Sequence, residues 1–198
     1  MTAVLSENEH ERIRVLRDKG VLEEINCEML DNARQGAILI PCADGHHFHD
    51  LFNHHTSICG AQHSAPMQHP LSLNGGALLI PEESPLRHQS DGSYTPDDEV
   101  LLRHLEGAIG LKKPKAVILY AHAPCGMARL HLLSVDDEFT LLAAAKERVR
   151  TRIAPLGVTD VRLWFHVCYA DSKRRTYQFR RHAWNQFVSG FATSAQAA

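Results

Sequence analysis

The sequence lacks the features that would direct it to a membrane or out of the cell. No apolar run approaches the roughly 18 residues that a membrane-spanning helix needs. The segment from Met1 to Asn8 has no basic stretch followed by an apolar stretch, as a secretory signal would have. We therefore expect a cytoplasmic protein that makes no membrane contact.

Neither sign of charge is in large excess. The 21 Lys and Arg residues nearly balance the 23 Asp and Glu residues, and the net charge is −2 with histidine neutral. A broad basic surface for nucleic acid is therefore not expected. One basic cluster stands out, and we interpret it as the solvated face of a turn and a strand. Its members are Lys173, Arg174, Arg175, Arg180 and Arg181.

Cysteine is scarce, whereas histidine is abundant. The five cysteines are odd in number and lie far apart, at positions 27, 42, 59, 125 and 168. This distribution favours thiol or metal chemistry over a disulfide framework. Seven of the fourteen histidines fall between His46 and His69. Because histidine is the commonest metal ligand and carries protons near neutral pH, this region is a candidate for a functional site.

Local signals predict several helices. Ser6 with Glu9 three residues later is a capping box, which predicts a helix over residues 7–19. A second helix is expected over residues 21–34, so that residues 1–35 would form an N-terminal helical arm. Further helices are expected over residues 46–55, from Thr95-Pro96 to Gly110, and after Ser134.

Short apolar runs bounded by turn signals predict the strands. Four such runs lie at residues 37–40, 77–80, 115–120 and 161–169, and residues 176–180 would return antiparallel. Because strands and helices alternate, we expect a single α/β domain over residues 1–198. It would contain a mostly parallel four-stranded sheet with helices on both faces and a possible antiparallel edge strand. Residues 56–74 are expected to form a loop, and residues 189–198 to fray.

Metal-ligating residue types follow two of the predicted strands. Cys42 and Asp44 come after the strand at 37–40, and His122 and Cys125 come after the strand at 115–120. Ligands of open parallel sheets bind at the carboxyl ends of the strands, so these side chains converge if the two strands are neighbours. Two thiolates, one imidazole and a fourth position for carboxylate or water form a tetrahedral zinc set. We therefore predict a zinc site.

At these residues the sequence resembles the β-class carbonic anhydrases. That family has Cys-x-Asp-x-Arg after one strand and His-x-x-Cys-Gly after another. Cys42 and Asp44 match the first motif, whereas His122, Cys125 and Gly126 match the second. The resemblance implies a zinc-dependent lyase that reversibly hydrates carbon dioxide to bicarbonate by zinc-bound hydroxide. It also implies a homodimer or a larger homo-oligomer.

One position departs from the family pattern. His46 stands where the family has an arginine that keeps the motif aspartate off the metal. We take His46 as a candidate catalytic residue in its place, and Arg87 or Arg129 as alternative substitutes. Without the arginine, Asp44 can either orient the zinc-bound hydroxide or close the zinc as its fourth ligand. The candidates for a proton relay are His46, His47 and His49.

Alternative interpretations stay open for the function. An enzyme of the same fold could hydrolyse another small substrate, such as carbonyl sulfide. A non-catalytic regulatory domain could hold a zinc site closed by two cysteines, one histidine and one aspartate.

Alternatives also stay open for single residues. Cys42 and Cys125 could be buried apolar thiols, and Asp44 could cap the helix at 46–55. Cys59 and His63 are a rival ligand pair, and Gly75-Gly76 is typical of a turn.

Overall fold

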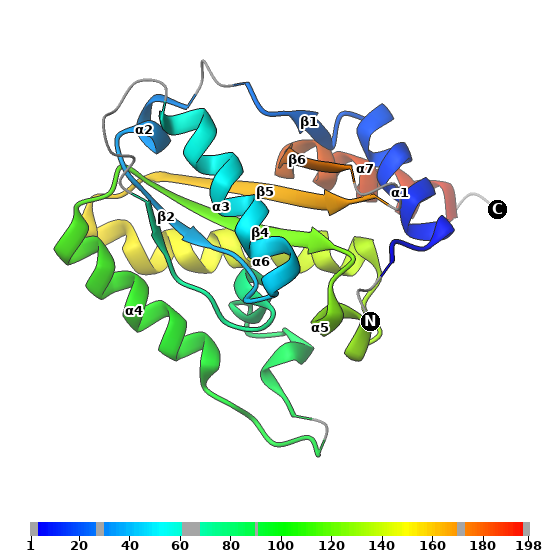
Figure 1. Cartoon of the computed structure of the whole chain (residues 1–198). Helices are drawn as coiled ribbons and strands as arrows, with labels where there is room; N and C mark the ends of the chain where they lie inside the picture. Colours follow the sequence, from blue (N-terminus) through cyan, green and yellow to red (C-terminus); the bar gives the residue numbers. More distant parts are fainter. Residues whose placement is uncertain (1–3, 27–29, 61–67, 90, 170–172, 196–198) are drawn as a thin grey trace.

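The computed structural model describes residues 4–26, 30–60, 68–89, 91–169 and 173–195. Its centre is a mixed six-stranded sheet in the order β1-β6-β5-β4-β2-β3 (Figure 1). The strands are β1 (Leu22–Glu24), β2 (Ala37–Ile40), β3 (Gln68–Pro70), β4 (Ala116–Ala123), β5 (Asp160–Cys168) and β6 (Arg174–Phe179).

Strand pairing divides the sheet into a parallel and an antiparallel part. β2 pairs in parallel with β3 and β4, and β4 pairs in parallel with β5. β6 is antiparallel to β5, and β1 is antiparallel to β6. The expected α/β class and the antiparallel return strand are confirmed. The predicted four-stranded sheet is wrong, because the sheet has six strands.

Helices connect and cover the strands. The α-helices are α1 (Glu7–Asp18), α2 (Asp31–Arg34), α3 (Gly45–Gly60), α4 (Asp97–Lys112), α5 (Gly126–Leu130), α6 (Val135–Ile153) and α7 (Arg181–Ala195). The shorter 3-10 helices are η2 (Gly76–Leu79), η3 (Pro85–Arg87) and η4 (Ala154–Leu156). The predicted capping box is present at α1, where the Glu9 backbone N–H donates to Ser6 Oγ and the Ser6 N–H donates to Glu9 Oε2.

The two faces of the sheet bury different sets of side chains. α1, α4, α6 and α7 contribute to a large core on one face, together with Leu119 and Phe165. A smaller core on the opposite face includes Tyr120 and Trp164 and is covered by α2 and α3. Leu119 and Tyr120 are consecutive in β4 and therefore point to opposite faces. Figure 1 shows α3 lying across one face and α6 across the other, so the predicted helices on both faces are confirmed.

The predicted strand at 77–80 is a 3-10 helix instead. Gly75 and Gly76 have φ values of +89° and +53°, and the buried run from Ala77 to Ile80 continues as η2 rather than pairing with another strand. A short apolar run has the same pattern in a buried strand and in a buried helical turn, so its length and composition did not decide between them.

Two short strands occur where none was predicted. β1 occupies part of the predicted second helix, of which only Asp31–Arg34 is helical among the described residues, so the arm at 1–35 is not wholly helical. β3 lies within the predicted loop at 56–74. Both strands have three residues and are defined by their partners, β6 and β2. Tertiary pairing of this kind overrides local propensity.

Helix ends also differ from expectation. α3 extends to Gly60, and α7 continues to Ala195, so residues 189–195 are helical although they were predicted to fray. Residues 196–198 lie outside the described residues. None of the helices in the described ranges has both the length and the apolar composition of a membrane-spanning helix.

Candidate metal centre

The predicted ligands meet because β2 and β4 are neighbouring parallel strands. Their register pairs Ile40 with Leu119, which brings both carboxyl ends to the same edge of the sheet. Cys42 lies two residues beyond β2, and His122 is the second-to-last residue of β4. Cys125 follows as the residue that precedes α5. The convergence that the sequence predicted for these three residues is therefore present.

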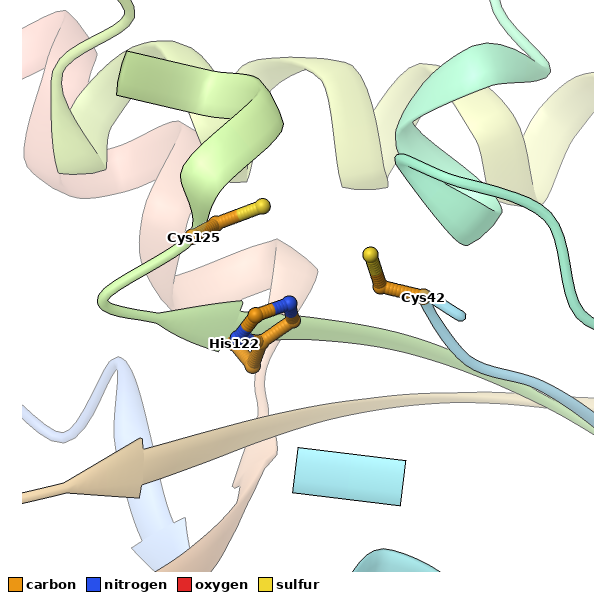
Figure 2. A group of neighbouring side chains, drawn as sticks. All are labelled: Cys42, His122 and Cys125. Atoms are coloured by element: carbon orange, nitrogen blue, oxygen red, sulfur yellow. The ribbon is translucent and has the colours of Figure 1, made fainter. Parts of the chain in front are cut away.

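The three side chains form a compact, buried group. One ligand atom from each of Cys42, His122 and Cys125 lies within 4.8 Å of the other two. The residues are only 4%, 2% and 2% exposed, respectively. Figure 2 shows both sulfurs and the imidazole ring turned toward one common space. Such a set of two sulfurs and one nitrogen can hold a tetrahedral metal ion if a fourth ligand completes it.

A glycine turn supports the first cysteine. The backbone N–H of Gly75 donates a hydrogen bond to Cys42 Sγ at 3.2 Å. A Cβ atom on Gly76 would lie 2.5 Å from the backbone N of Cys42 and 2.5 Å from the carbonyl carbon of Pro41. Gly75-Gly76 is thus the predicted turn, and it also packs directly under the cysteine. No local sequence pattern links this turn to Cys42.

The two thiols shift each other's pKa in opposite directions. The pKa of Cys42 is well below the usual range of a thiol, because the Cys125 thiol can donate to its sulfur and because His122 and the Gly75 N–H lie beside it. The pKa of Cys125 is raised by the same contact with Cys42 and by burial. One sulfur is therefore a thiolate, which is the form that binds metals.

The buried polar atoms of this group fit a metal ion. Both ring nitrogens of His122 are buried and have no hydrogen-bond partner in the described parts of the chain. Buried polar groups are normally paired, so an orphaned imidazole beside a thiolate needs a partner. Sulfur and imidazole ligands favour zinc over magnesium or calcium. The residues present therefore fit a zinc ion with Cys42, His122 and Cys125 as ligands.

Asp44 caps α3 and also reaches toward the centre. Its Oδ1 accepts a hydrogen bond from the His46 N–H at 2.9 Å, and its carbonyl accepts from the His47 and Phe48 N–H groups. The alternative role of Asp44 as a helix cap is therefore confirmed. One of its carboxylate oxygens also lies within 4.8 Å of ring nitrogens of His47 and His122. Asp44 is half-buried, and capping does not remove it from the site.

His47, rather than His46, is the histidine buried at the centre. The rings of His47 and His122 lie 4.1 Å apart between centroids, and His47 is 3% exposed. Burial and the neighbouring His122 lower the pKa of His47 to about 4, so its imidazole is neutral at pH 7. Leu51 and His55, four and eight residues further along α3, are also buried. This helical spacing is the signal that could have identified His47.

A third buried histidine adjoins the pair. His166 in β5 is paired in register with His122, and its ring centroid is 5.5 Å from that of His47. Its Nδ1 lies 2.9 Å from Thr176 Oγ1 in β6. Burial, followed by the nearby His47, lowers the pKa of His166 to about 3. The neutral imidazoles of His47 and His166 therefore lie next to each other beside the metal centre.

The suggested substitutes for the family arginine lie in other surroundings. His46 is exposed, and its carbonyl accepts a hydrogen bond from Arg174 Nη1 at 3.1 Å. Arg87 pairs with Asp98 at 3.1 Å. Arg129 pairs with Glu9 at 2.8 Å and so anchors α1. The catalytic role of His46 stays a prediction.

Glu138 is a buried carboxyl that the sequence analysis did not single out. It lies in α6 and is 2% exposed, and its Oε2 has no hydrogen-bond partner in the described ranges. Burial raises its pKa well above the usual value, and the negative charges of Glu9 and Cys42 add to this effect. Glu138 in turn contributes to the raised pKa of Cys125. Glu138 stands at helical spacing from apolar residues of α6, and only its charge distinguishes it from them.

Cys168 does not belong to the candidate ligand groups of the described residues. It is half-buried in β5. Cys27 and His63 lie outside the described residues, and so does the rival pairing of Cys59 with His63.

No family model matches the sequence, and no curated protein matches it. Solved structures with a similar arrangement include several β-carbonic anhydrases. CafD of the fungus Aspergillus fumigatus aligns with a TM-score of 0.46 and 14% identity over 80% of this chain and 99% of its own. Isoform I from Trichomonas vaginalis aligns with a TM-score of 0.40 and 12% identity, over 89% of this chain and 100% of its own. A tetrameric β-carbonic anhydrase from Sordaria macrospora aligns with a TM-score of 0.39 and 12% identity, over 85% of this chain and 88% of its own. This similarity is distant, so the chemistry has to follow from the residues of this chain.

Proposed function

We propose that this protein is a zinc-dependent lyase of the β-carbonic anhydrase type, which interconverts carbon dioxide and bicarbonate. The observation that carries the proposal is the buried convergence of Cys42, His122 and Cys125 at the carboxyl ends of two parallel strands. Asp44 lies beside it. The same four residues carry the motif resemblance, so geometry and motif support one site.

Cys42, His122 and Cys125 would hold the metal. A bound zinc ion would supply a Lewis acid that turns water into a nucleophile near neutral pH. The Gly75 N–H on Cys42 Sγ orients that ligand and spreads its negative charge. Burial of all three side chains keeps the dielectric low, which strengthens each electrostatic contact.

Asp44 would orient the reacting water. Its carboxylate is fixed by the His46 N–H at 2.9 Å, so the position of one oxygen is set by the start of α3. The second oxygen would be left to accept a hydrogen bond from the nucleophile. His47 lies close to both Asp44 and His122 and would hold the carboxylate away from the metal, which is the task of the arginine in the family that the motifs resemble.

Histidines at the start of α3 would carry the released proton to solvent. His46 and His49 are exposed, whereas His47 is buried beside the ligands. A path from a buried site to water needs groups at both depths, and imidazoles have suitable proton affinities.

The test is stopped-flow hydration of carbon dioxide by metal-quantified protein between about pH 6.5 and 9, beside a Cys125→Ser variant. We expect hydration that rises with pH and is lost in the variant. A stoichiometric zinc protein that hydrates nothing at any pH would refute the proposal for carbon dioxide. Carbonyl sulfide is tested in parallel as the alternative substrate of an enzyme of this fold.

A non-catalytic zinc domain is the second candidate function. The observation that favours it is the burial of all three ligands, each at most 4% exposed, with an Asp44 carboxylate oxygen within 4.8 Å of a ring nitrogen of His122. Such a closed site would stabilise the fold and leave no position for water. Cobalt substitution separates the two, because an open site changes its visible spectrum when azide is added and a closed site does not.

The assembly and the location are part of the same proposal. A homodimer or a larger homo-oligomer in the cytoplasm is expected, with a small substrate and no nucleic acid or membrane partner.

A further inference from the structure

A cavity lies beside α1, and none of its lining residues belongs to the metal centre. Its volume is about 560 Å³, within the range of pockets that take small organic ligands. Among the described residues, three cationic side chains line it, Arg17, Lys173 and Arg175, and one acid, Glu7. This part of the lining therefore has more positive than negative groups, in a protein whose overall charge is −2.

The basic residues at the start of β6 point to opposite sides of the sheet. Arg174 contacts Asp50 and the His46 carbonyl of α3, and Thr176 contacts His166. Successive side chains of a strand point to opposite faces, so Lys173 and Arg175 point the other way, into the cavity. The basic cluster interpreted as a solvated face is thus split, and part of it faces a concave surface.

Two of the cations, Arg17 and Arg175, are weakly engaged by acids in the described residues. Arg17 has no ion pair recorded in the described parts of the chain, and its guanidinium lies 5.1 Å from the ring centroid of Tyr177. Arg175 approaches Glu24 only to 3.8 Å, and both side chains are more than half exposed. Such exposed pairs contribute little stability and exchange readily for a better anion.

Aromatic side chains complete the wall. The Tyr169 and Tyr177 hydroxyls lie 3.1 Å apart, and the ring of His10 meets the ring of Tyr169 edge-on at 5.5 Å. Burial raises the pKa of Tyr177, and the Tyr169 hydroxyl adds to the effect, so the phenol stays protonated. These groups offer a hydroxyl donor and an apolar surface next to the cations.

The wall formed by α1 is held in place. Arg12 makes a two-pronged contact with Asp136 at 2.7 and 2.5 Å, and Glu9 pairs with Arg129 at 2.8 Å. Both contacts tie α1 to the body of its own domain. The cavity is therefore formed before any ligand arrives, which lowers the entropic cost of binding.

We propose that this cavity binds a phosphate group, either as the free ion or on a small organic molecule. Arg17 and Arg175 present planar forks of N–H donors that match phosphate oxygens, and Lys173 adds a third charge. A phosphate monoester carries close to two negative charges at neutral pH, which balances the cationic excess of the lining.

The test is isothermal titration calorimetry of the full chain with adenosine 5′-monophosphate, inorganic phosphate and adenosine. We expect the two phosphates to bind more weakly as salt rises, and adenosine not to bind. The comparison of the two phosphates identifies the source, since equal affinities indicate the free ion and tighter binding of the nucleotide indicates an organic ligand. Arg17→Gln and Arg175→Gln should each weaken binding by about tenfold or more.

Arg14→Gln is the matched control. Arg14 lies on the same helix, is paired with Glu11 and does not line the cavity. It should bind like the unaltered chain. Failure of both phosphates to bind below about 5 mM would overturn the proposal. So would binding that the Arg17→Gln and Arg175→Gln variants retain in full, or adenosine binding as tightly as the nucleotide.

Discussion

At the scale of single residues, Gly76 has the most restricted position next to the metal centre. Its φ is +53°, and an added Cβ would meet the backbone at Pro41 and Cys42 at 2.5 Å. We expect Gly76→Ala to displace Cys42, to lower the free energy of unfolding by about 2 kcal/mol or more, and to weaken zinc retention. Urea unfolding and zinc release to a chelator measure both effects.

Gly107 provides the control for Gly76. It lies on the exposed side of α4, and a Cβ there meets nothing within 4 Å. Gly107→Ala should therefore stabilise the protein by about 0.5–1 kcal/mol through helix propensity. Equal stability of the two variants would show that the close approach under Cys42 is unimportant.

We expect different results for substitutions of the adjacent residues His46 and His47. His47 is buried beside His122 and Asp44, so His47→Ala should lower zinc affinity by about 10- to 100-fold, as loss of a supporting contact does at other metal sites. His46→Ala removes an exposed ring and should leave zinc affinity within about twofold. Competition with a zinc-binding dye compares them directly. A larger loss for His46→Ala would favour the original assignment of the catalytic histidine to position 46.

Sequence reasoning found the ligands but not their supports. Cys42, His122 and Cys125 could be predicted because each directly follows or ends a buried strand, where parallel sheets place ligands. His47 was not distinguished from His46, although its helical spacing from Leu51 and His55 marks it as part of a buried helix face. The contact between Gly75 and Cys42 joins residues 33 positions apart, and no local pattern reports it.

At the scale of elements, α3 makes the fold sensitive to acid. His55 is 1% exposed and packs near Trp164, and burial, with His54 next to it, lowers its pKa to about 4. The folded state therefore keeps His55 neutral, while the unfolded chain takes up a proton near the ordinary pKa of 6.5. The stability contributed by a neutral His55 is present above about pH 6.5 and is lost as the pH falls toward 4.

The corresponding measurement is urea unfolding at pH 7 and pH 5. The unaltered protein should lose about 2 kcal/mol through His55 between these values, and His55→Leu should lose correspondingly less. His104→Leu changes an exposed residue of α4 and should leave the pH dependence unchanged. A pH dependence that is the same in all three proteins would contradict the burial of a neutral His55.

Elements were predictable where local signals were strong. The capping box at Ser6 and the cap at Ser134 correctly located the starts of α1 and α6, since their side-chain contacts are local. β1 and β3 were missed because three residues hold too little pattern, and their partner strands define them. The run at 77–80 was misassigned because burial without alternation fits either a strand or a 3-10 turn.

At the scale of the whole molecule, an apolar patch next to the metal centre predicts self-association. Leu130 and Leu132 follow directly on the segment that carries Cys125, and they are 71% and 91% exposed. Neighbouring exposed leucines mark interaction surfaces more often than isolated ones. We expect a dimer in sedimentation velocity that the double change Leu130→Lys and Leu132→Lys converts to a monomer.

Leu111 serves as the control for this patch. It is 82% exposed and lies at the end of α4, so Leu111→Lys should leave the dimer intact. A monomer in the unaltered protein would contradict the predicted self-association, and dissociation by Leu111→Lys alone would place the interface at α4 instead of α5.

The central claim is that Cys42, His122 and Cys125 hold one zinc ion per chain. Zinc-edge X-ray absorption on the purified protein, combined with metal quantification, tests it most directly. We predict one zinc per chain with two sulfur neighbours at about 2.3 Å and nitrogen or oxygen neighbours at about 2.0 Å. Cys125→Ser should remove one of the sulfur neighbours. Zinc that is absent, or bound without sulfur, would contradict the assignment of this site and the function proposed for it.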